Sequence, residues 1–282
     1  MQTDPAQQYS RNFCEREYNA RAAVPTHKDF FLRWAARSAA ARSAMSGYLD
    51  LPYGPGALQT LDLFPADTAR GLMVLIHGGY WRSLDKSDFS FVAEPFIARG
   101  ISVASINYSL CPAARIATIV DDAARAIAWL HSHASRFGYA GKPIVIAGHS
   151  AGGHLAAMML TRDWPAYGVP DPAIAGAIGV SGIYDLEPLL HTSMNDDLHL
   201  DAAALATVSP VRLTPTLRVP LHLVAGGAES GEFQRQGRVL AQAWPDTVRT
   251  CTLAPGENHF SIVEHFADAQ SPAFHAAAML FA

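Results

Sequence analysis

A serine flanked by glycines carries the strongest chemical signal in this chain. Ser150 lies in the sequence G-H-S-A-G, residues 148–152, which follows the apolar run 144–147 and precedes an alanine- and methionine-rich segment that predicts a helix. This order of strand, turn and helix is typical of a nucleophile elbow, where glycines two residues before and after the serine allow a sharp bend. We therefore predict that Ser150 is a nucleophile. A Ser-Gly-rich turn without chemistry is the alternative if the chain supplies no base, acid or oxyanion site.

A histidine near the end of the chain has the position of a general base. His259 follows a strand predicted at residues 248–253, and reactive groups gather at the carboxyl ends of strands in open α/β sheets. A neutral imidazole can accept the hydroxyl proton of Ser150 and later return it to the leaving group. Of the 12 histidines, His259 is the one whose chain position fits this role. A surface histidine in a loop is the alternative.

Three carboxylates compete for the role of the acid that orients His259. Glu229 comes first after a strand predicted at residues 219–225, and we prefer it for that reason. Glu232 falls in the first turn of the next predicted helix, where a carboxylate complements the helix dipole. Asp185 follows the preceding strand and is the rival. The order Ser150, Glu229, His259 is that of α/β hydrolases.

An oxyanion site is predicted from the sequence H-G-G-Y-W at residues 77–81, directly after an apolar strand at 72–76. Its glycines let backbone N–H groups converge on a developing oxyanion, and each such donor contributes roughly a hundred- to a thousand-fold in rate. The predicted donors are the N–H groups of Gly78, Gly79, Tyr80 and Ala151. A turn with a merely structural role is the alternative.

The elements that must position these residues alternate along the chain. Apolar strands and amphipathic helices in alternation predict an α/β fold, with a mostly parallel sheet covered by helices on both faces. One domain of 282 residues accommodates this pattern, with a helical N-terminal segment at about 9–47 and a cap-like insertion at about 184–216. Further strands are predicted at 58–64, 101–106 and 174–180, and helices at 87–98, 118–137 and 231–244.

Composition excludes several classes of function. A net charge of -4 without any block of Lys or Arg argues against a nucleic-acid partner. No run of eighteen apolar residues is present to span a membrane, and the first eight residues lack the features of a signal peptide, so we expect a cytoplasmic protein. The three cysteines are far apart, which predicts neither disulfides nor a metal site. We expect no cofactor and a small-molecule substrate, and a homodimer is compatible with the sequence.

Several motifs together resemble a known family. The chain is similar to the kynurenine formamidase (arylformamidase) branch of the α/β hydrolases over most of its length. That resemblance implies the α/β-hydrolase fold and an aryl amide substrate such as N-formylkynurenine. The chain departs from the family pattern at Glu229, where better-studied formamidases carry Asp, although the longer side chain can still reach the imidazole. The matching segments are 18–25, 77–81, 107–112, 148–154, 181–186 and 229–236.

The residues after the oxyanion glycines predict the shape of the substrate pocket. Tyr80 and Trp81 stand where related esterases have a third glycine, so we expect little room for the acyl group and favour formyl or acetyl. Trp81, Tyr184 and Phe260 could flank an aromatic leaving group, because aromatic faces pack on rings at about 0.5–1.5 kcal/mol per pair. Core or lid packing is the alternative for each of these three.

Three functions are compatible with these residues. The first is a serine hydrolase that releases a small acyl group from an aryl amide through an acyl-enzyme intermediate. The second is a short-acyl carboxylesterase that uses the same residues. The third is a hydrolase fold that binds a ligand without catalysis, and Ser150, His259 and the oxyanion glycines count against it.

Overall fold

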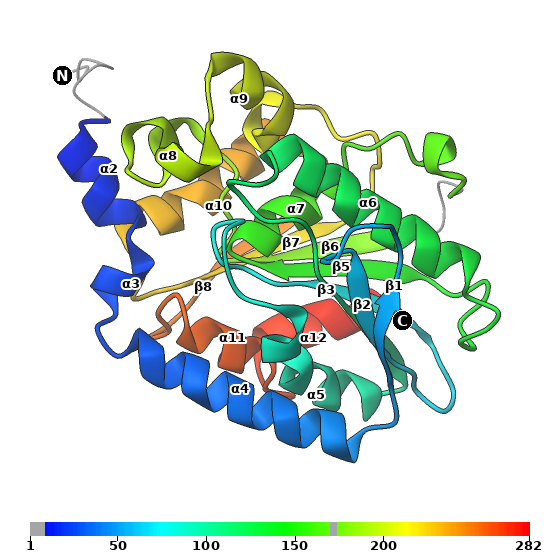
Figure 1. Cartoon of the computed structure of the whole chain (residues 1–282). Coiled ribbons are helices and arrows are strands. Elements are labelled where there is room, and N and C mark those ends of the chain that lie inside the picture. The colour runs from blue at the N-terminus through cyan, green and yellow to red at the C-terminus, as the bar shows by residue number, and fades with distance from the viewer. Residues whose placement is uncertain (1–8, 170–173) are drawn as a thin grey trace.

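A single sheet runs through the molecule. The computed structural model describes residues 9–169 and 174–282, and these contain eight strands in the order β1-β2-β4-β3-β5-β6-β7-β8 (Figure 1). The prediction that residues 1–8 are not a signal peptide lies outside the described residues. The strands are β1 (Tyr48–Pro52), β2 (Thr60–Phe64), β3 (Gly71–Ile76), β4 (Ile101–Ile106), β5 (Ile144–His149), β6 (Ile174–Val180), β7 (Leu221–Gly226) and β8 (Val248–Ala254).

The pairing of the strands explains why the central segments are apolar throughout. β1 pairs with β2 and β2 with β4 in antiparallel fashion, whereas all pairs from β4 through β3 to β8 are parallel. Every residue of β3, β4 and β5 is buried, as expected for parallel strands covered on both faces. The α/β-hydrolase fold predicted from the sequence is confirmed, and the carboxyl ends of β5, β6, β7 and β8 meet at one edge of the sheet.

Helices cover both faces of this sheet. Figure 1 shows α6, α7 and α10 on one face and α5, α11 and α12 on the other. The helix α7 follows β5 directly and packs on β5 and β6, which fixes the position of the turn between β5 and α7. The bounds are α5 (Ala93–Ile97), α6 (Ile116–Ser132), α7 (Ala151–Met159), α10 (Gly231–Ala243), α11 (Ser261–Phe266) and α12 (Pro272–Met279).

The helical N-terminal segment consists of α2 (Arg11–Tyr18), α3 (Ala20–Ala23) and α4 (His27–Ala44). α4 packs on the 3-10 helix η1 (Lys86–Val92), and α2 packs on α10. Two arginines of this segment bind the rest of the chain: the guanidinium of Arg42 donates to the carbonyl of Ser87, and that of Arg33 pairs with Glu264 at 3.2 Å. These contacts hold the segment against the sheet domain.

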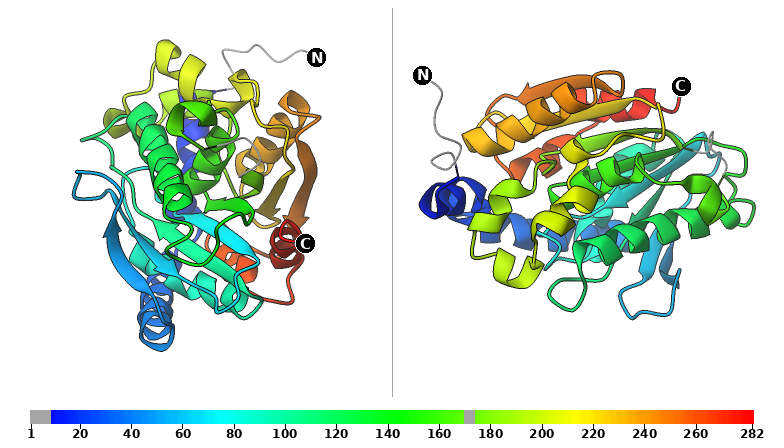
Figure 2. Two further views of the ribbon diagram at one scale, coloured as in Figure 1. Left: turned by 90° about the vertical axis from the view of Figure 1, so that its right-hand side faces the viewer. Right: turned by 90° about the horizontal axis from the view of Figure 1, so that it is seen from above.

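The insertion between β6 and β7 lies over the carboxyl edge of the sheet. It consists of short helices, η4 (Glu187–His191), α8 (Asn195–Leu198), α9 (Ala202–Val208) and η5 (Pro210–Arg212). The helix α2 lies beside this insertion, as the view from above in Figure 2 shows. Two segments far apart in the sequence therefore flank the same end of the strands.

Three sequence-based boundaries differ from the structure. The predicted helix at 87–98 is η1 followed by the short α5, because residues 89–92 are all buried and packing overrides helical periodicity. The helix predicted at 118–137 begins at Ile116 and ends at Ser132. The strand predicted at 58–64 begins at Thr60 as β2, and the unpredicted β1 pairs with it in antiparallel fashion. No helix in the described ranges is both long and apolar enough to cross a bilayer.

Two other histidines, His77 and His154, are fully buried in the core. His77 stacks on Tyr108 at 4.4 Å between ring centroids, and its Nδ1 donates to the carbonyl of Gly78. His154 donates from Nε2 to the carbonyl of Val208. Burial lowers the pKa of each imidazole to about 4. Both are therefore neutral in the folded protein at neutral pH.

These histidines predict how stability depends on pH. In the unfolded chain each imidazole has a pKa near 6.5, so between about pH 4 and 6.5 the unfolded state binds more protons than the folded state. The free energy of unfolding should accordingly be highest above about pH 6.5 and should fall as the pH is lowered toward 4. His154→Gln retains a donor for Val208 and removes one titrating group, so its slope in this window should be smaller by about 1.4 kcal/mol per pH unit. Urea unfolding at pH 7, 6 and 5 measures this slope, and an unchanged slope would contradict the assignment.

Candidate active site

The turn between β5 and α7 places the side chain of Ser150. Ser150 has φ 56° and ψ -116°, a strained conformation for a residue with a Cβ atom, and such strain is typical of functional turns. Both flanking positions require glycine, because a Cβ atom at either one would clash with a backbone carbonyl oxygen. A Cβ atom on Gly148 would lie 2.1 Å from the carbonyl oxygen of Gly152, and one on Gly152 would lie 2.0 Å from that of Ile76. The predicted elbow geometry is therefore enforced by backbone packing.

A continuous line of hydrogen bonds joins Ser150 to Glu229 through His259. The Ser150 hydroxyl lies 3.1 Å from Nε2 of His259, and Nδ1 of His259 lies 2.7 Å from Oε2 of Glu229. Ser150 is 2% exposed, His259 is 5% exposed, and the Glu229 side chain is 1% exposed. The three come from the ends of β5, β7 and β8, so the parallel sheet brings together residues far apart in sequence.

The carboxylate of Glu229 is oriented by two further donors. Its Oε1 accepts from the hydroxyl of Ser181, at the end of β6, and from the N–H of Gly226 at 2.6 Å. Both carboxylate oxygens are therefore bonded, and Oε2 is directed at the imidazole. A buried carboxylate with this many donors is fixed in orientation.

The two rival carboxylates are bonded elsewhere. Asp185 Oδ2 accepts from Arg235 at 2.9 Å. Glu232 Oε2 accepts from the buried hydroxyl of Tyr18 at 2.8 Å and also from Arg235. Both carboxylates thus bind Arg235 of α10, and the geometry places Glu229 beside His259.

Sequence reasoning missed three residues that contact His259 or Glu229. His149 donates from Nε2 to the carbonyl of His259 at 2.8 Å, and Phe233 packs on the His259 ring at 4.3 Å between centroids. The pKa of His149 is lowered mainly by burial and also by the neighbouring His259. His149 therefore acts as a neutral donor. Ser181 is the third. Its position at a strand's carboxyl end was the one available signal, since nothing in the sequence directs His149 or Phe233 toward this loop.

The predicted oxyanion turn lies directly against the elbow. A Cβ atom on Gly78 would come within 3.1 Å of the Ser150 Cβ atom, so no larger residue fits there. Gly79 has φ 107° and Tyr80 has φ 53°, and no hydrogen bond within the described residues uses the N–H of either. Ala151 begins α7, so its N–H has no partner within the helix. N–H groups without a partner therefore occur in the turn after β3 and at the start of α7, the two elements that adjoin Ser150.

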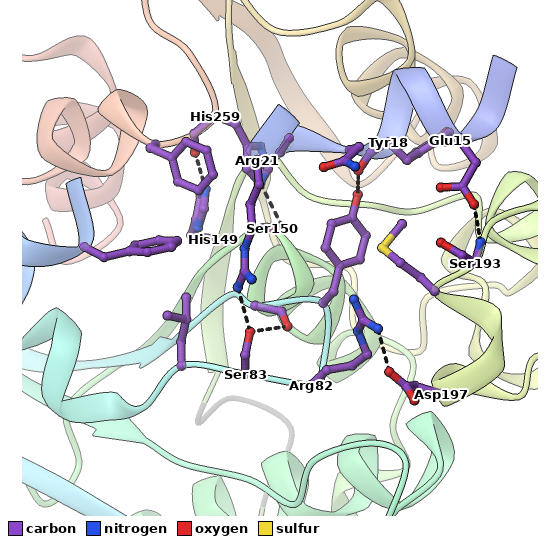
Figure 3. A pocket seen from close by; sticks show the side chains of 18 of the residues that line it. Glu15, Tyr18, Arg21, Arg82, Ser83, His149, Ser150, Ser193, Asp197 and His259 are labelled. Atoms are coloured by element: carbon purple, nitrogen blue, oxygen red, sulfur yellow. Dashed lines mark hydrogen bonds and ion pairs between the residues drawn. The ribbon is translucent and has the colours of Figure 1, made fainter. Parts of the chain in front are cut away.

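A cavity of about 410 Å³ opens above these groups, within the range of small-molecule sites. Figure 3 shows His149, Ser150 and His259 together in this pocket, with Glu15, Ser193 and Asp197 on its other side. The N-terminal segment, the oxyanion turn, the insertion and the histidine loop all contribute walls. Lining residues include Tyr18, Arg21, Phe31, Trp34, Tyr80, Arg82, Met194 and Phe260.

Two of the three predicted aromatic pocket residues are placed in the core. Phe260 lines the pocket as predicted. Trp81 is fully buried and packs edge-on against His154 at 4.9 Å, because the turn at 79–81 directs its ring under the sheet edge. Tyr184 is 1% exposed, and its hydroxyl fills the space beside Gly179 and Gly182. Neither Trp81 nor Tyr184 flanks the cavity above Ser150, so core packing is the correct interpretation for both.

Comparison with known proteins agrees with this fold. A family model described as BD-FAE matches residues 61–210. A kynurenine formamidase of Salmo salar is 33% identical over 242 residues, which cover 81% of this chain and 80% of that protein. Esterase LipQ of Mycobacterium tuberculosis is 33% identical over 150 residues, which cover 49% of this chain and 35% of that protein. These relatives are hydrolases.

A solved structure extends the similarity to nearly the whole chain. A crystal structure described as a candidate thioesterase from a Silicibacter species is 34% identical, with a TM-score of 0.82, and covers 94% of this chain and 98% of its own. The similarity thus includes the N-terminal segment and the insertion that form the pocket walls.

Proposed function

This chain belongs to the kynurenine formamidase branch of the α/β hydrolases, and we propose that it releases a small acyl group, formyl or similar, from an aryl amide such as N-formylkynurenine. The observation that carries the proposal is the line of hydrogen bonds from Glu229 through His259 to Ser150 at the floor of an open pocket. It is the arrangement that nucleophilic acyl transfer requires.

The first half of the reaction forms an acyl-enzyme. Ser150 Oγ attacks the substrate carbonyl while its proton passes to Nε2 of His259. Glu229 accepts the Nδ1 proton of the ring in a hydrogen bond, which fixes the tautomer and stabilises the imidazolium. The oxyanion is stabilised by the N–H groups of Gly79, Tyr80 and Ala151. The C–N bond then breaks, and His259 returns the proton to the departing arylamine.

The second half returns the enzyme to its starting state. Water enters as the arylamine leaves. His259 removes a proton from this water while the water oxygen attacks the acyl carbon. Collapse of the second tetrahedral intermediate breaks the bond to Ser150 Oγ, which regains a proton from the imidazole. A formyl group leaves as formate. No group outside the chain and water is needed to balance these steps.

The fixed position of Tyr80 supports a small acyl group. Its ring lines the cavity next to the oxyanion turn, and its hydroxyl donates to the carbonyl of Tyr18 at 2.5 Å. The side chain is therefore held between the turn and the N-terminal segment and cannot swing aside for a long acyl chain. Phe31, Trp34 and Phe260 provide aromatic walls for the leaving group.

A comparison of substrates tests this proposal. We expect kcat/KM for N-formylkynurenine to exceed that for its N-butyryl analogue by at least about a hundred-fold, because a hydrophobic pocket discriminates by about 1–3 kcal/mol for one methylene and three are added. The same enzyme should be measured with phenyl acetate and phenyl butyrate. Efficient cleavage of the esters without measurable cleavage of N-formylkynurenine would refute the amide substrate.

A short-acyl carboxylesterase is the second candidate function. The similarity to Esterase LipQ over 49% of this chain favours it, and ester cleavage would use the same groups. An ester leaving group needs less help from the imidazolium than an amine does, so the two functions separate by substrate and not by residue. The comparison described above decides between them.

A further inference from the structure

We propose that Arg21 forms an anion-binding subsite at the mouth of the pocket, so that preferred substrates carry a carboxylate on the leaving group. The proposal names the substrate class of the reaction proposed above and rests on that function for its chemistry. It is carried by the position of the guanidinium and by the charges around it.

Arg21 belongs to α3 and lines the same cavity as Ser150. Its Nη2 donates to the hydroxyl of Ser83 at 3.2 Å, and Figure 3 shows the side chain reaching across the pocket toward that residue. Its guanidinium carbon lies 5.6 Å from the centroid of the Phe31 ring. Ser83 in turn donates to the carbonyl of Gly79, so the cation is held beside the oxyanion turn.

The other charged groups of the pocket are already partnered. Arg82 pairs with Asp197 at 2.6 Å. Glu15 accepts from the N–H of Ser193 and lies 4.0 Å from Arg11. Among the residues that the structure describes, no carboxylate lies within ion-pair distance of Arg21. The pocket therefore presents one cation whose polar partner is a neutral hydroxyl.

Other arginines of the N-terminal segment show that this arrangement is specific to position 21. Arg16 pairs with Glu17 at 3.0 Å, and Arg33 and Arg37 both pair with Glu264. These guanidinium groups are satisfied by the protein and do not line the cavity. Arg21 is the guanidinium left to bind a ligand in this pocket.

The chemistry of guanidinium favours a carboxylate over other anions of the same charge. Its planar fork can donate two parallel hydrogen bonds to the two carboxylate oxygens, and such charge-assisted bonds are stronger than neutral ones. Arg21 is exposed, which limits the gain and makes it sensitive to salt. An arylamine that carries an amino acid side chain, as in N-formylkynurenine, supplies a carboxylate on the leaving-group side of the scissile bond.

A matched pair of ester substrates tests the subsite independently of formamidase activity. We would compare 4-acetoxybenzoate with its methyl ester, which differ in the negative charge and share the acyl group. We expect the ratio of kcat/KM, carboxylate over methyl ester, to be lower in Arg21→Gln than in wild type by up to about fivefold, mainly through KM. Arg21→Lys should retain part of the ratio. Arg33→Gln, which removes an arginine outside the cavity, should leave it unchanged.

The outcomes separate this inference from the proposed function. An equal loss of kcat/KM for both esters in Arg21→Gln indicates a structural role and overturns the subsite. An unchanged kcat/KM for both esters overturns it as well. A reduced ratio supports the subsite even if N-formylkynurenine is not cleaved. If N-formylkynurenine is cleaved, its decarboxylated analogue N-formylkynuramine should lose the dependence on Arg21, and in wild type the KM for N-formylkynurenine should rise with ionic strength.

Discussion

Ser150→Ala is expected to leave a folded protein whose rate of hydrolysis is lower by several orders of magnitude, on the order of a million-fold in kcat. The attacking atom is lost, while the N–H groups at the oxyanion turn and the pocket can still give a small residual rate. The fold should persist because alanine retains the Cβ atom that serine already places at φ 56°. Circular dichroism and a thermal melt check the fold, and kcat with the best substrate checks the rate.

The control for this variant is Ser193→Ala. Ser193 also lines the pocket, but its contact to Glu15 is made by the backbone N–H, so the loss of its hydroxyl should change kcat little. A serine-directed phosphonate should modify wild type at Ser150 alone, as peptide mass spectrometry can show. An active Ser150→Ala protein, or labelling at another serine, would refute the proposed mechanism.

Glu229→Gln is expected to reduce kcat by up to about ten-thousand-fold without unfolding the protein. The glutamine amide has the same shape as the carboxylate, but one of its two ends is an NH₂ group that donates a hydrogen bond instead of accepting one. If its oxygen accepts from Ser181 and Gly226, as Oε1 does now, its NH₂ group faces Nδ1 of His259. The imidazole must then carry its proton on Nε2, and this tautomer cannot accept the proton of Ser150. The stabilisation of the imidazolium is lost as well.

Asp185→Asn and Glu232→Gln are the matched controls, since each removes one charge from a nearby carboxylate bonded to Arg235. Both should keep kcat within a few-fold of wild type, although the contacts of Arg235 should weaken. The measurement is kcat and the unfolding temperature for all three variants. A crippled Asp185→Asn enzyme beside an active Glu229→Gln enzyme would reverse the assignment.

The sequence by itself determined the fold and predicted the nucleophile. Apolar strands alternating with amphipathic helices allow few arrangements besides a parallel sheet covered on both faces. In the G-x-S-x-G turn, a Cβ atom at Gly152 or Gly148 would lie 2.0 or 2.1 Å from a backbone oxygen. The geometry of the turn therefore requires the glycines of the motif. His259 was found the same way, because the end of a parallel strand fixes where the following loop lies.

Only the tertiary structure decided between residues whose chain positions were equivalent. Glu229, Glu232 and Asp185 all follow strands near the same edge, and what separates them is Arg235, which binds two of them, and Ser181 and Gly226, which bind the third. The burial of Trp81 and Tyr184 could likewise not be predicted from the sequence. A positive φ at Trp81 sets the direction of its ring, and the space beside Gly179 and Gly182 accommodates the Tyr184 hydroxyl. A local pattern specifies where the backbone goes, whereas the direction and the partner of a side chain depend on residues that can lie more than two hundred positions away, as the bond from Tyr18 to Glu232 illustrates.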